Sequence, residues 1–87
     1  MDASSFEFAV SMPRDARFAD AVRRLAVQAA QYAGCAAGDA DPFGRVVEDA
    51  FQGCLAGAST AAVPLMFRRA AGPLEVVVEG RLLTLDV

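Results

Sequence analysis

Three short segments of the chain alternate apolar side chains with smaller or polar ones, the pattern of a strand that buries one face, and a fourth segment that follows them is apolar almost throughout. They cover residues 6–12, 63–69, 74–78 and 81–87. In the second segment we expect the apolar residues at every other position, starting from its first residue, to point inward. Glu79-Gly80, between the last two segments, fits a two-residue hairpin turn. The sequence therefore predicts one strand before the central part of the chain and three strands after it.

In the central part, apolar residues recur every three or four positions and predict two amphipathic helices. The first is expected from Phe18 to Gly34, with Asp15 as its N-cap and the glycine as its C-terminal stop. Residues 36–40 are expected to form a loop, and Asp41-Pro42 to begin the second helix. The expected buried stripes are Phe18, Val22, Leu25, Ala29 and Tyr32 in the first helix, and Phe43, Val46, Val47, Ala50, Phe51, Cys54, Leu55 and Ala58 in the second.

This order, β-α-α-β-β-β, predicts a single domain over residues 1–87 of the α/β class. Its fold would be a two-layer sandwich with a mostly antiparallel sheet and two helices packed on one face. The other face would carry Glu7, Ala9, Ser11, Met66, Arg68, Glu75 and Val77. Because that face mixes charged with apolar side chains and the chain is small, a second molecule covering it or a sheet edge would add appreciable buried surface.

Composition and charge narrow the classes of partner. Of the 87 residues, 55% are hydrophobic and the net charge is −3, with a mean hydropathy of +0.35; this balance is typical of a folded domain. The acidic balance offers no attraction for nucleic acid or for an anionic membrane surface. Histidine is absent, which removes the commonest general base and a frequent zinc ligand. We therefore expect no nucleic acid, no membrane, no metal and no other cofactor among the partners.

The cysteines and the first residues indicate a cytoplasmic protein. Cys35 follows the expected end of the first helix and Cys54 lies in the apolar stripe of the second, which is the usual setting of small buried hydrophobic side chains. The first five residues have neither the basic nor the apolar region of a secretion signal, and no run of 18 apolar residues occurs. We therefore expect a cytoplasmic location and two unpaired thiols.

One resemblance covers nearly the whole chain at the level of pattern. The first strand ends in Met12-Pro13, an Arg-rich helix ends at a glycine, a short acidic loop follows, and the second helix contains residues 45–57, Arg-Val-Val-Glu-Asp-Ala-Phe-Gln-Gly-Cys-Leu-Ala-Gly. This layout resembles the GHKL, or histidine-kinase-like, ATPase fold, and within it the small anti-sigma-factor serine kinases of the partner-switching type. Residues 45–57 align without gaps to the N-box helix of that family.

The resemblance implies catalytic roles for two residues of the second helix. Glu48 stands where the family places a Glu that orients water or accepts a proton, and Gln52 stands where an Asn coordinates Mg²⁺. The glutamine carries its carbonyl oxygen one methylene farther out, whereas Mg²⁺ demands near-ideal octahedral geometry. Ala56 replaces the family's His, and Gly57 keeps the family type. Gly53 reflects either close packing against the first helix or family ancestry.

The sequence departs further from the family after the third predicted strand. There the family has an Asp-x-Gly-x-Gly box that reads adenine and then a Gly-rich lid. Here residues 76–78 run into Glu79-Gly80-Arg81-Leu82-Leu83, which resembles the family's last strand joined directly to the third. The resemblance therefore implies a degenerate domain that has lost the nucleotide-reading box and the lid, and in which Glu48 and Gln52 are vestiges of the catalytic pair.

Three functions are compatible with these features. The first is a non-catalytic bacterial regulatory module for protein–protein interaction; the use of Arg for all eight basic residues fits a GC-rich bacterial genome. The second is a minimal ATP-binding serine kinase or ATPase that uses Glu48 and Gln52. The third is a structural subunit that completes a larger sheet through an exposed strand edge. We favour the first, because phosphoryl transfer also needs a metal and a phosphate cradle.

Two groups of residues are candidates for an interface. The first is Met66, Val77 and Leu82; the last predicted strand is apolar at both parities, and such strands usually have both faces covered. We therefore expect a homodimer, or a complex with another protein, through the face or edge that bears these residues. The second group is Arg23 and Arg24 in the first helix, which are suited to a phosphate or carboxylate of a partner or simply supply surface charge.

Overall fold

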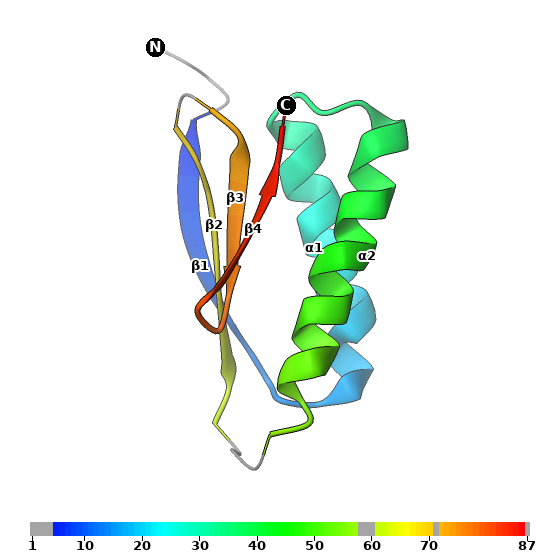
Figure 1. Ribbon diagram of the computed structural model, residues 1–87, viewed down its shortest axis with the longest axis vertical. Coiled ribbons are helices and arrows are strands. Elements are labelled where there is room, and N and C mark those ends of the chain that lie inside the picture. Colours follow the sequence, from blue (N-terminus) through cyan, green and yellow to red (C-terminus); the bar gives the residue numbers. More distant parts are fainter. Residues whose placement is uncertain (1–4, 58–60, 71, 87) are drawn as a thin grey trace.

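A four-stranded sheet with two helices on one face makes up the computed structural model, which describes residues 5–57, 61–70 and 72–86 (Figure 1). The elements are β1 (Phe6–Met12), η1 (Ala16–Phe18, a 3-10 turn), α1 (Ala19–Tyr32), α2 (Ala37–Cys54), β2 (Val63–Arg69), β3 (Leu74–Val78) and β4 (Arg81–Leu85). The order β-α-α-β-β-β and the two layers confirm the predicted fold class.

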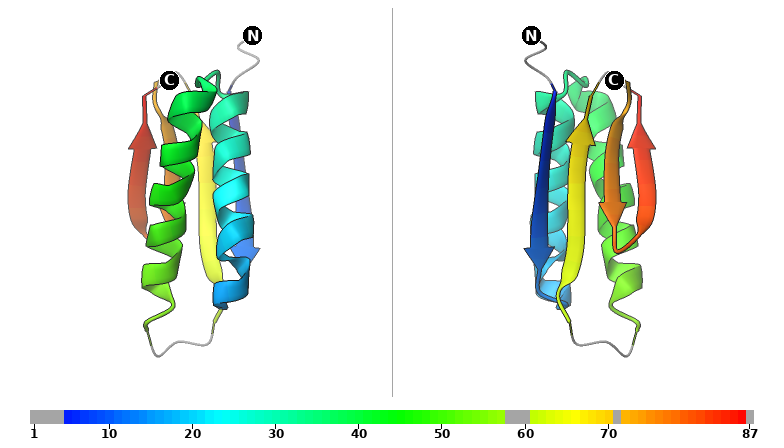
Figure 2. Two further views of the ribbon diagram at one scale, coloured as in Figure 1. Left: turned by 90° about the vertical axis from the view of Figure 1, so that its right-hand side faces the viewer. Right: turned by 90° about the vertical axis from the view of Figure 1, so that its left-hand side faces the viewer.

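The sheet has the order β1-β2-β3-β4, and every neighbouring pair is antiparallel. The helical hairpin of α1 and α2 returns the chain to the side of β1, where β2 pairs with it, and two tight connections then add β3 and β4. Figure 2 shows both helices across one face of the sheet and, in the opposite view, the four strands with nothing in front of them. One face of the sheet is therefore uncovered, and β1 and β4 are its edges.

The core lies between the sheet and the helices. Its sheet half consists of the inward residues of the two central strands, all at most 1% exposed: Val63, Leu65, Phe67, Leu74, Val76 and Val78. Its helical half consists of Ala19, Val22, Ala26, Ala29, Ala30, Ala40, Phe43, Val47, Ala50 and Phe51. The inward positions predicted for the second strand are confirmed.

The predicted ends of α1 are confirmed by their hydrogen bonds. The Asp15 carboxylate accepts from the backbone N–H of Arg17 at 2.9 Å and so caps the short η1 turn that leads into the helix. At the other end Gly34 has φ +100°, a conformation that favours glycine. The N–H of Cys35 then donates to the carbonyl of Ala30 at 3.0 Å, which closes the last turn.

The expected start of the second helix is wrong by about one turn. Helix α2 begins at Ala37, within the segment expected to be a loop, and Pro42 lies inside it. The N–H groups of Asp39 and Ala40 both donate to the carbonyl of Ala36, each at 3.0 Å, and Ala40 is fully buried. Burial of Ala40 and the two hydrogen bonds to Ala36 favour this additional turn, although Pro42 cannot donate a backbone hydrogen bond.

Two residues expected in the buried stripes are exposed instead. Tyr32 is 63% exposed and Val46 is 49% exposed. The buried face of α1 is rotated toward a line of alanines, because these small side chains let the helix pack closely against its neighbours. Tyr32 consequently stands at the edge of the sheet, where its ring meets Phe6 edge-on with centroids 5.3 Å apart.

The helices approach closely at Gly44. A Cβ atom there would lie 2.5 Å from Cγ2 of Val27 and 3.1 Å from the carbonyl oxygen of Arg23, both in α1. Around a Cβ placed on Gly53, by contrast, no atom would lie within 4 Å. Of the two alternatives for Gly53, close packing against the first helix is therefore wrong, and Gly44 is the glycine that the helix pair requires.

This difference predicts opposite effects for the same substitution at the two glycines. Gly44→Ala should destabilise the domain by about 1–3 kcal/mol through overpacking against Val27. Gly53→Ala should stabilise it by up to about 1 kcal/mol, because alanine has the higher helix propensity and the site is open. Urea unfolding followed by circular dichroism measures both. Equal effects of the two changes would show that the helices do not meet at Gly44.

The predicted hairpin turn between β3 and β4 is confirmed. Glu79 and Gly80 have φ values of 49° and 88°, so both central residues are left-handed, as a type I′ turn requires. The N–H of Glu79 also donates to the carbonyl of Pro64 at 2.9 Å. This turn fixes which residues of β3 and β4 face one another.

At the end of the sheet where β1 finishes, the side chain of Arg14 connects its own segment to three others. Its guanidinium donates to the carbonyl of Cys54 in α2, to the carbonyl of Ala61 before β2, and to the carboxylate of Glu79 in the hairpin, each at 2.7 Å. The Arg14 side chain is only 8% exposed. It therefore holds the helix layer and the sheet together at this end, a role that its position beside the first helix does not reveal.

Candidate interaction surface

The uncovered face of the sheet carries an apolar row that crosses all four strands. Ala9 pairs with Met66, Met66 with Val77, and Val77 with Leu82, so the four side chains stand side by side. Leu82 is 53% exposed, and Met66 and Val77 are half-buried. The structure therefore brings together the three sheet residues that the sequence marked as interface candidates, and it adds Ala9 to them.

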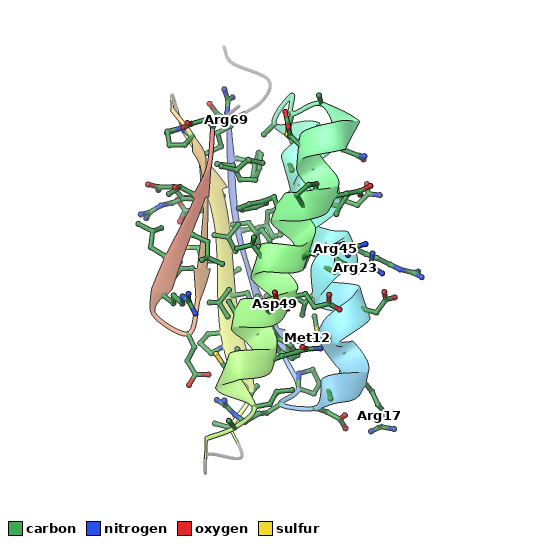
Figure 3. All side chains as sticks on the ribbon, turned by 45° about the vertical axis from the view of Figure 1, so that its right-hand side comes forward. Met12, Arg17, Arg23, Arg45, Asp49 and Arg69 are labelled. Carbon is green, nitrogen blue, oxygen red and sulfur yellow. The ribbon has the colours of Figure 1, made fainter. Side chains whose placement is uncertain are left out.

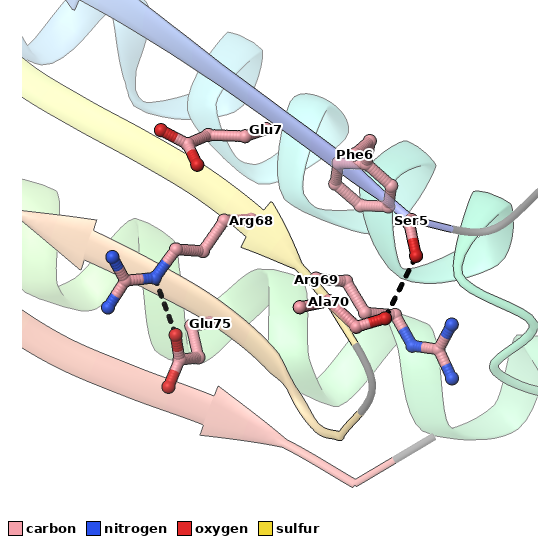
Figure 4. A pocket seen from close by; sticks show the side chains of 7 residues that line it. All are labelled: Ser5, Phe6, Glu7, Arg68, Arg69, Ala70 and Glu75. Carbon is pink, nitrogen blue, oxygen red and sulfur yellow. Dashed lines mark hydrogen bonds and ion pairs between the residues drawn. The ribbon is translucent and has the colours of Figure 1, made fainter. Parts of the chain in front are cut away.

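A charged row lies beside the apolar row, two residues along each strand. It consists of Glu7, Arg68, Glu75 and Thr84, which are again direct pairing partners. Nε of Arg68 donates to Oε1 of Glu75 at 2.5 Å, and this hydrogen bond raises the pKa of the Arg68 guanidinium above its usual value. Figure 4 shows Arg68 reaching across to Glu75, with Glu7 on the neighbouring strand. Negative, positive and negative charges thus follow one another across β1, β2 and β3.

The charged row borders an open hollow of about 660 Å³ at the end of the sheet where β1 begins. The Ser5 hydroxyl donates to the carbonyl of Ala70 at 2.9 Å across it (Figure 4). This bond ties the start of β1 to the end of β2. Two polar contacts at the hollow, Ser5 with Ala70 and Arg68 with Glu75, therefore join neighbouring strands.

Glu48 and Gln52, the vestigial catalytic candidates, lie on α2 in the other layer of the molecule. Oε1 of Glu48 is 3.9 Å from Nε of Arg23, and both line an open hollow of about 460 Å³ together with Arg45 and Asp49. Figure 3 shows Arg23 and Arg45 on the helix layer. Gln52 is exposed and is not among the residues that line this hollow.

Arg23 and Arg24 do not join the other interface candidates. Both pair with Asp20 in their own helix, and Nε of Arg24 is 2.9 Å from that carboxylate. The hydrogen bond from Arg23 lowers the pKa of Asp20. Because these residues lie on the helix layer and the apolar row faces away from it, the five candidates belong to two different surfaces.

A second apolar surface, which the sequence did not indicate, borders the edge strand β1. It is a groove of about 380 Å³ between β1 and α1, lined by Phe6, Phe8, Leu25, Gln28, Ala29 and Tyr32. The ring of Phe8 stacks on that of Phe67 with centroids 5.0 Å apart. In the sequence, this groove is indicated only by the alternating aromatic residues Phe6 and Phe8. That alternation by itself predicts a buried strand face and not an exposed groove.

The thiols offer no reactive group. Cys35 and Cys54 are free, and burial raises the pKa of both, so the nucleophilic thiolate form is disfavoured. Within residues 5–57, 61–70 and 72–86, no cluster of three potential metal-ligating side chains occurs. In the same part of the chain, neither helix has the length and apolar character needed to cross a bilayer.

Comparisons with protein-family models, with curated proteins and with solved structures give no match to this chain. What is established is thus a small α/β fold, with a four-stranded antiparallel sheet and two helices, and no family is identified.

Proposed function

We propose that this chain is a non-catalytic module for regulatory protein–protein interaction in the bacterial cytoplasm, derived from a GHKL-type ATPase domain of the anti-sigma-factor kind. Its binding surface is the apolar row together with the charged row. The observation that carries the proposal is the continuous line of Ala9, Met66, Val77 and Leu82 across the uncovered face.

The chemistry of this face suits a protein partner. An antiparallel sheet with one solvated face normally alternates apolar residues inward with polar residues outward, and β3 and β4 break that rule at Val77 and Leu82. Removal of this apolar surface from water favours association with a partner. The adjoining Arg68 and Glu75 supply charges that orient a partner.

The surroundings of the vestigial pair support a non-catalytic role. The Glu48 carboxylate lies 3.9 Å from the Arg23 guanidinium, and Gln52 is exposed and does not line their hollow. Strand β3 also passes through the two-residue turn Glu79-Gly80 directly into β4, at the place where the related ATPases carry their adenine-reading box. The alternative function, a minimal ATP-binding serine kinase or ATPase, would have to use Glu48 and Gln52 in this setting.

A calorimetric titration with ATP and Mg²⁺ tests this proposal. We expect no binding heat, because the altered N-box and the direct β3–β4 turn leave the nucleotide without its usual contacts. Binding tighter than about 1 mM, roughly −4 kcal/mol, would overturn the non-catalytic function. In that case, loss of the heat in Glu48→Ala and Gln52→Ala would establish the alternative enzyme.

The groove beside β1 favours a second candidate function, completion of a larger sheet. An edge strand presents unpaired backbone groups to an added strand, and the groove lined by Phe8 and Tyr32 would take alternate side chains of that strand. If this alternative holds, Tyr32→Asp should abolish association with the added strand, whereas Leu82→Asp should leave that association intact.

A further inference from the structure

We propose that the partner of the uncovered sheet face is a second copy of this chain, related by a two-fold axis that runs parallel to the strands between β2 and β3. This inference rests on the proposed function and names the partner of the same surface. It is based on the order of the side chains in the two rows. When a row is laid against a copy of itself in the reverse order, the facing side chains complement each other in size or charge.

The position of the axis determines which residues meet. A two-fold axis parallel to the strands places β1 opposite β4 of the second copy, and β2 opposite β3. It keeps each row at the same level, so each row meets its own reversed copy. The two sheets would then pack face to face with strands about 30° apart and a spacing of about 10 Å, as in aligned sandwiches.

Side-chain sizes match across this arrangement. In the apolar row, Leu82 meets Ala9 of the second copy, so the most exposed large side chain of the row lies against its smallest one. Met66 meets Val77 in the same way, and methionine adapts its shape to irregular gaps. The side chains of the row can therefore interdigitate with those of the second copy. At both ends of the row a large side chain faces a small one.

Charges match in the neighbouring row. Arg68 meets Glu75 of the second copy, and Glu75 meets the second Arg68, while Glu7 meets the uncharged Thr84. Within one chain Arg68 already donates from Nε to Glu75. A guanidinium has five N–H donors, so its other nitrogens can bond to the second carboxylate. The result is a ring of two arginines and two glutamates with alternating signs.

The size of the face indicates a weak dimer. Four strands about 4.8 Å apart, with about six residues each at 3.3 Å, give roughly 400 Å² per copy and about 800 Å² in total. Stable interfaces of standard size bury about 1,200–2,000 Å². The area is therefore that of a weak or transient contact, and we expect a dimer that dissociates on dilution.

Sedimentation equilibrium from about 5 µM to 1 mM measures this association. Leu82→Asp should weaken the dimer at least about tenfold, because it places an unpaired carboxylate against the second copy. Val46→Asp is the matched control, since Val46 is almost equally exposed but lies on α2. Tyr32→Asp is the control for the β1 groove. Both controls should leave the dissociation constant unchanged, and circular dichroism establishes that all three variants fold.

Two charge-reversal variants, at Arg68 and Glu75, test the direction of the two-fold axis. In Arg68→Glu two glutamates would face each other across the interface, and in Glu75→Arg two arginines would, so each variant alone should be monomeric. Mixed in equal amounts, the two variants should form a heterodimer nearly as tight as the parent dimer, because every charge then faces its opposite. A two-fold axis perpendicular to the strands would move the charged row away from its copy, and mixing would restore nothing.

Three results would overturn the inference. One is a monomer at every concentration up to 1 mM, which would assign the face to a different protein. Another is association that Leu82→Asp leaves intact and that Tyr32→Asp or Val46→Asp removes, which would assign it to the groove beside β1 or to the helix layer. The last is association that Leu82→Asp removes but that the mixed charge variants do not recover. The nucleotide titration is unaffected by all three, so a failure of the inference is distinguishable from a failure of the proposed function.

Discussion

Phe51→Ala is expected to lower the free energy of unfolding by about 3–5 kcal/mol. Phe51 is fully buried on the inner face of α2 and is among the largest of the completely enclosed side chains. Its removal would leave a cavity between the helix layer and the sheet, which a close-packed core of this size can refill only in part. Because a domain of this kind is stabilised by about 5–15 kcal/mol in all, this loss is a large fraction of the total.

Urea unfolding followed by circular dichroism measures this loss, with Glu48→Ala as the control on the same helix. The Glu48 carboxylate is half-buried and makes only a long ion pair with Arg23, so its removal should change the stability by no more than about 0.5 kcal/mol. An unchanged unfolding midpoint in Phe51→Ala would mean that α2 presents a different face to the sheet.

Arg14→Met is expected to lower the free energy of unfolding by about 2–4 kcal/mol. The change leaves the carbonyls of Cys54 and Ala61 without this donor and leaves Glu79 without its cation. Arg14→Lys should recover only part of the loss, because a single ammonium group cannot direct hydrogen bonds along the same fixed fork.

Arg17→Met provides the comparison for Arg14. Arg17 also pairs with a carboxylate, that of Asp15 at 2.9 Å, but its side chain is 84% exposed. Water screens an exposed pair of this kind, so the substitution should be nearly neutral. If the two arginines proved equally dispensable in chemical denaturation, the three hydrogen bonds of Arg14 would not stabilise the fold.

Local chemistry in the sequence was enough to predict most elements of the fold. The first three strands follow from alternation, which depends only on the two-residue repeat of an extended chain. The ends of the first helix follow from Asp15 and Gly34, since a cap acts on backbone groups a few residues away. The Glu79-Gly80 turn is local in the same sense.

Predictions failed where a residue's environment is supplied by distant parts of the chain. Tyr32 and Val46 fit the helical repeat but lie beyond the area that the sheet covers. Gly44 and Gly53 are alike in sequence, and only the approach of α1 distinguishes them. The start of α2 was placed too late because Pro42 suggested a first turn, whereas burial of Ala40 extends the helix before it.

For the candidate surface, too, some features follow from the sequence and others depend on the tertiary structure. The sequence by itself determined that Met66 and Val77 are apolar residues on strand faces turned away from the helices, because strand parity is a local property. Parity alone does not assign Leu82 to a face, since its strand is apolar at both parities. The pairing of Val77 with Leu82 also follows from the short turn between their strands. Only the tertiary structure decided that Ala9 and Met66 complete the row, that Arg68 and Glu75 form its charged neighbour, and that Arg23 and Arg24 belong to another surface. The physical reason is that β1 and β2 are separated by both helices, so their register depends on the packing of the whole helical layer.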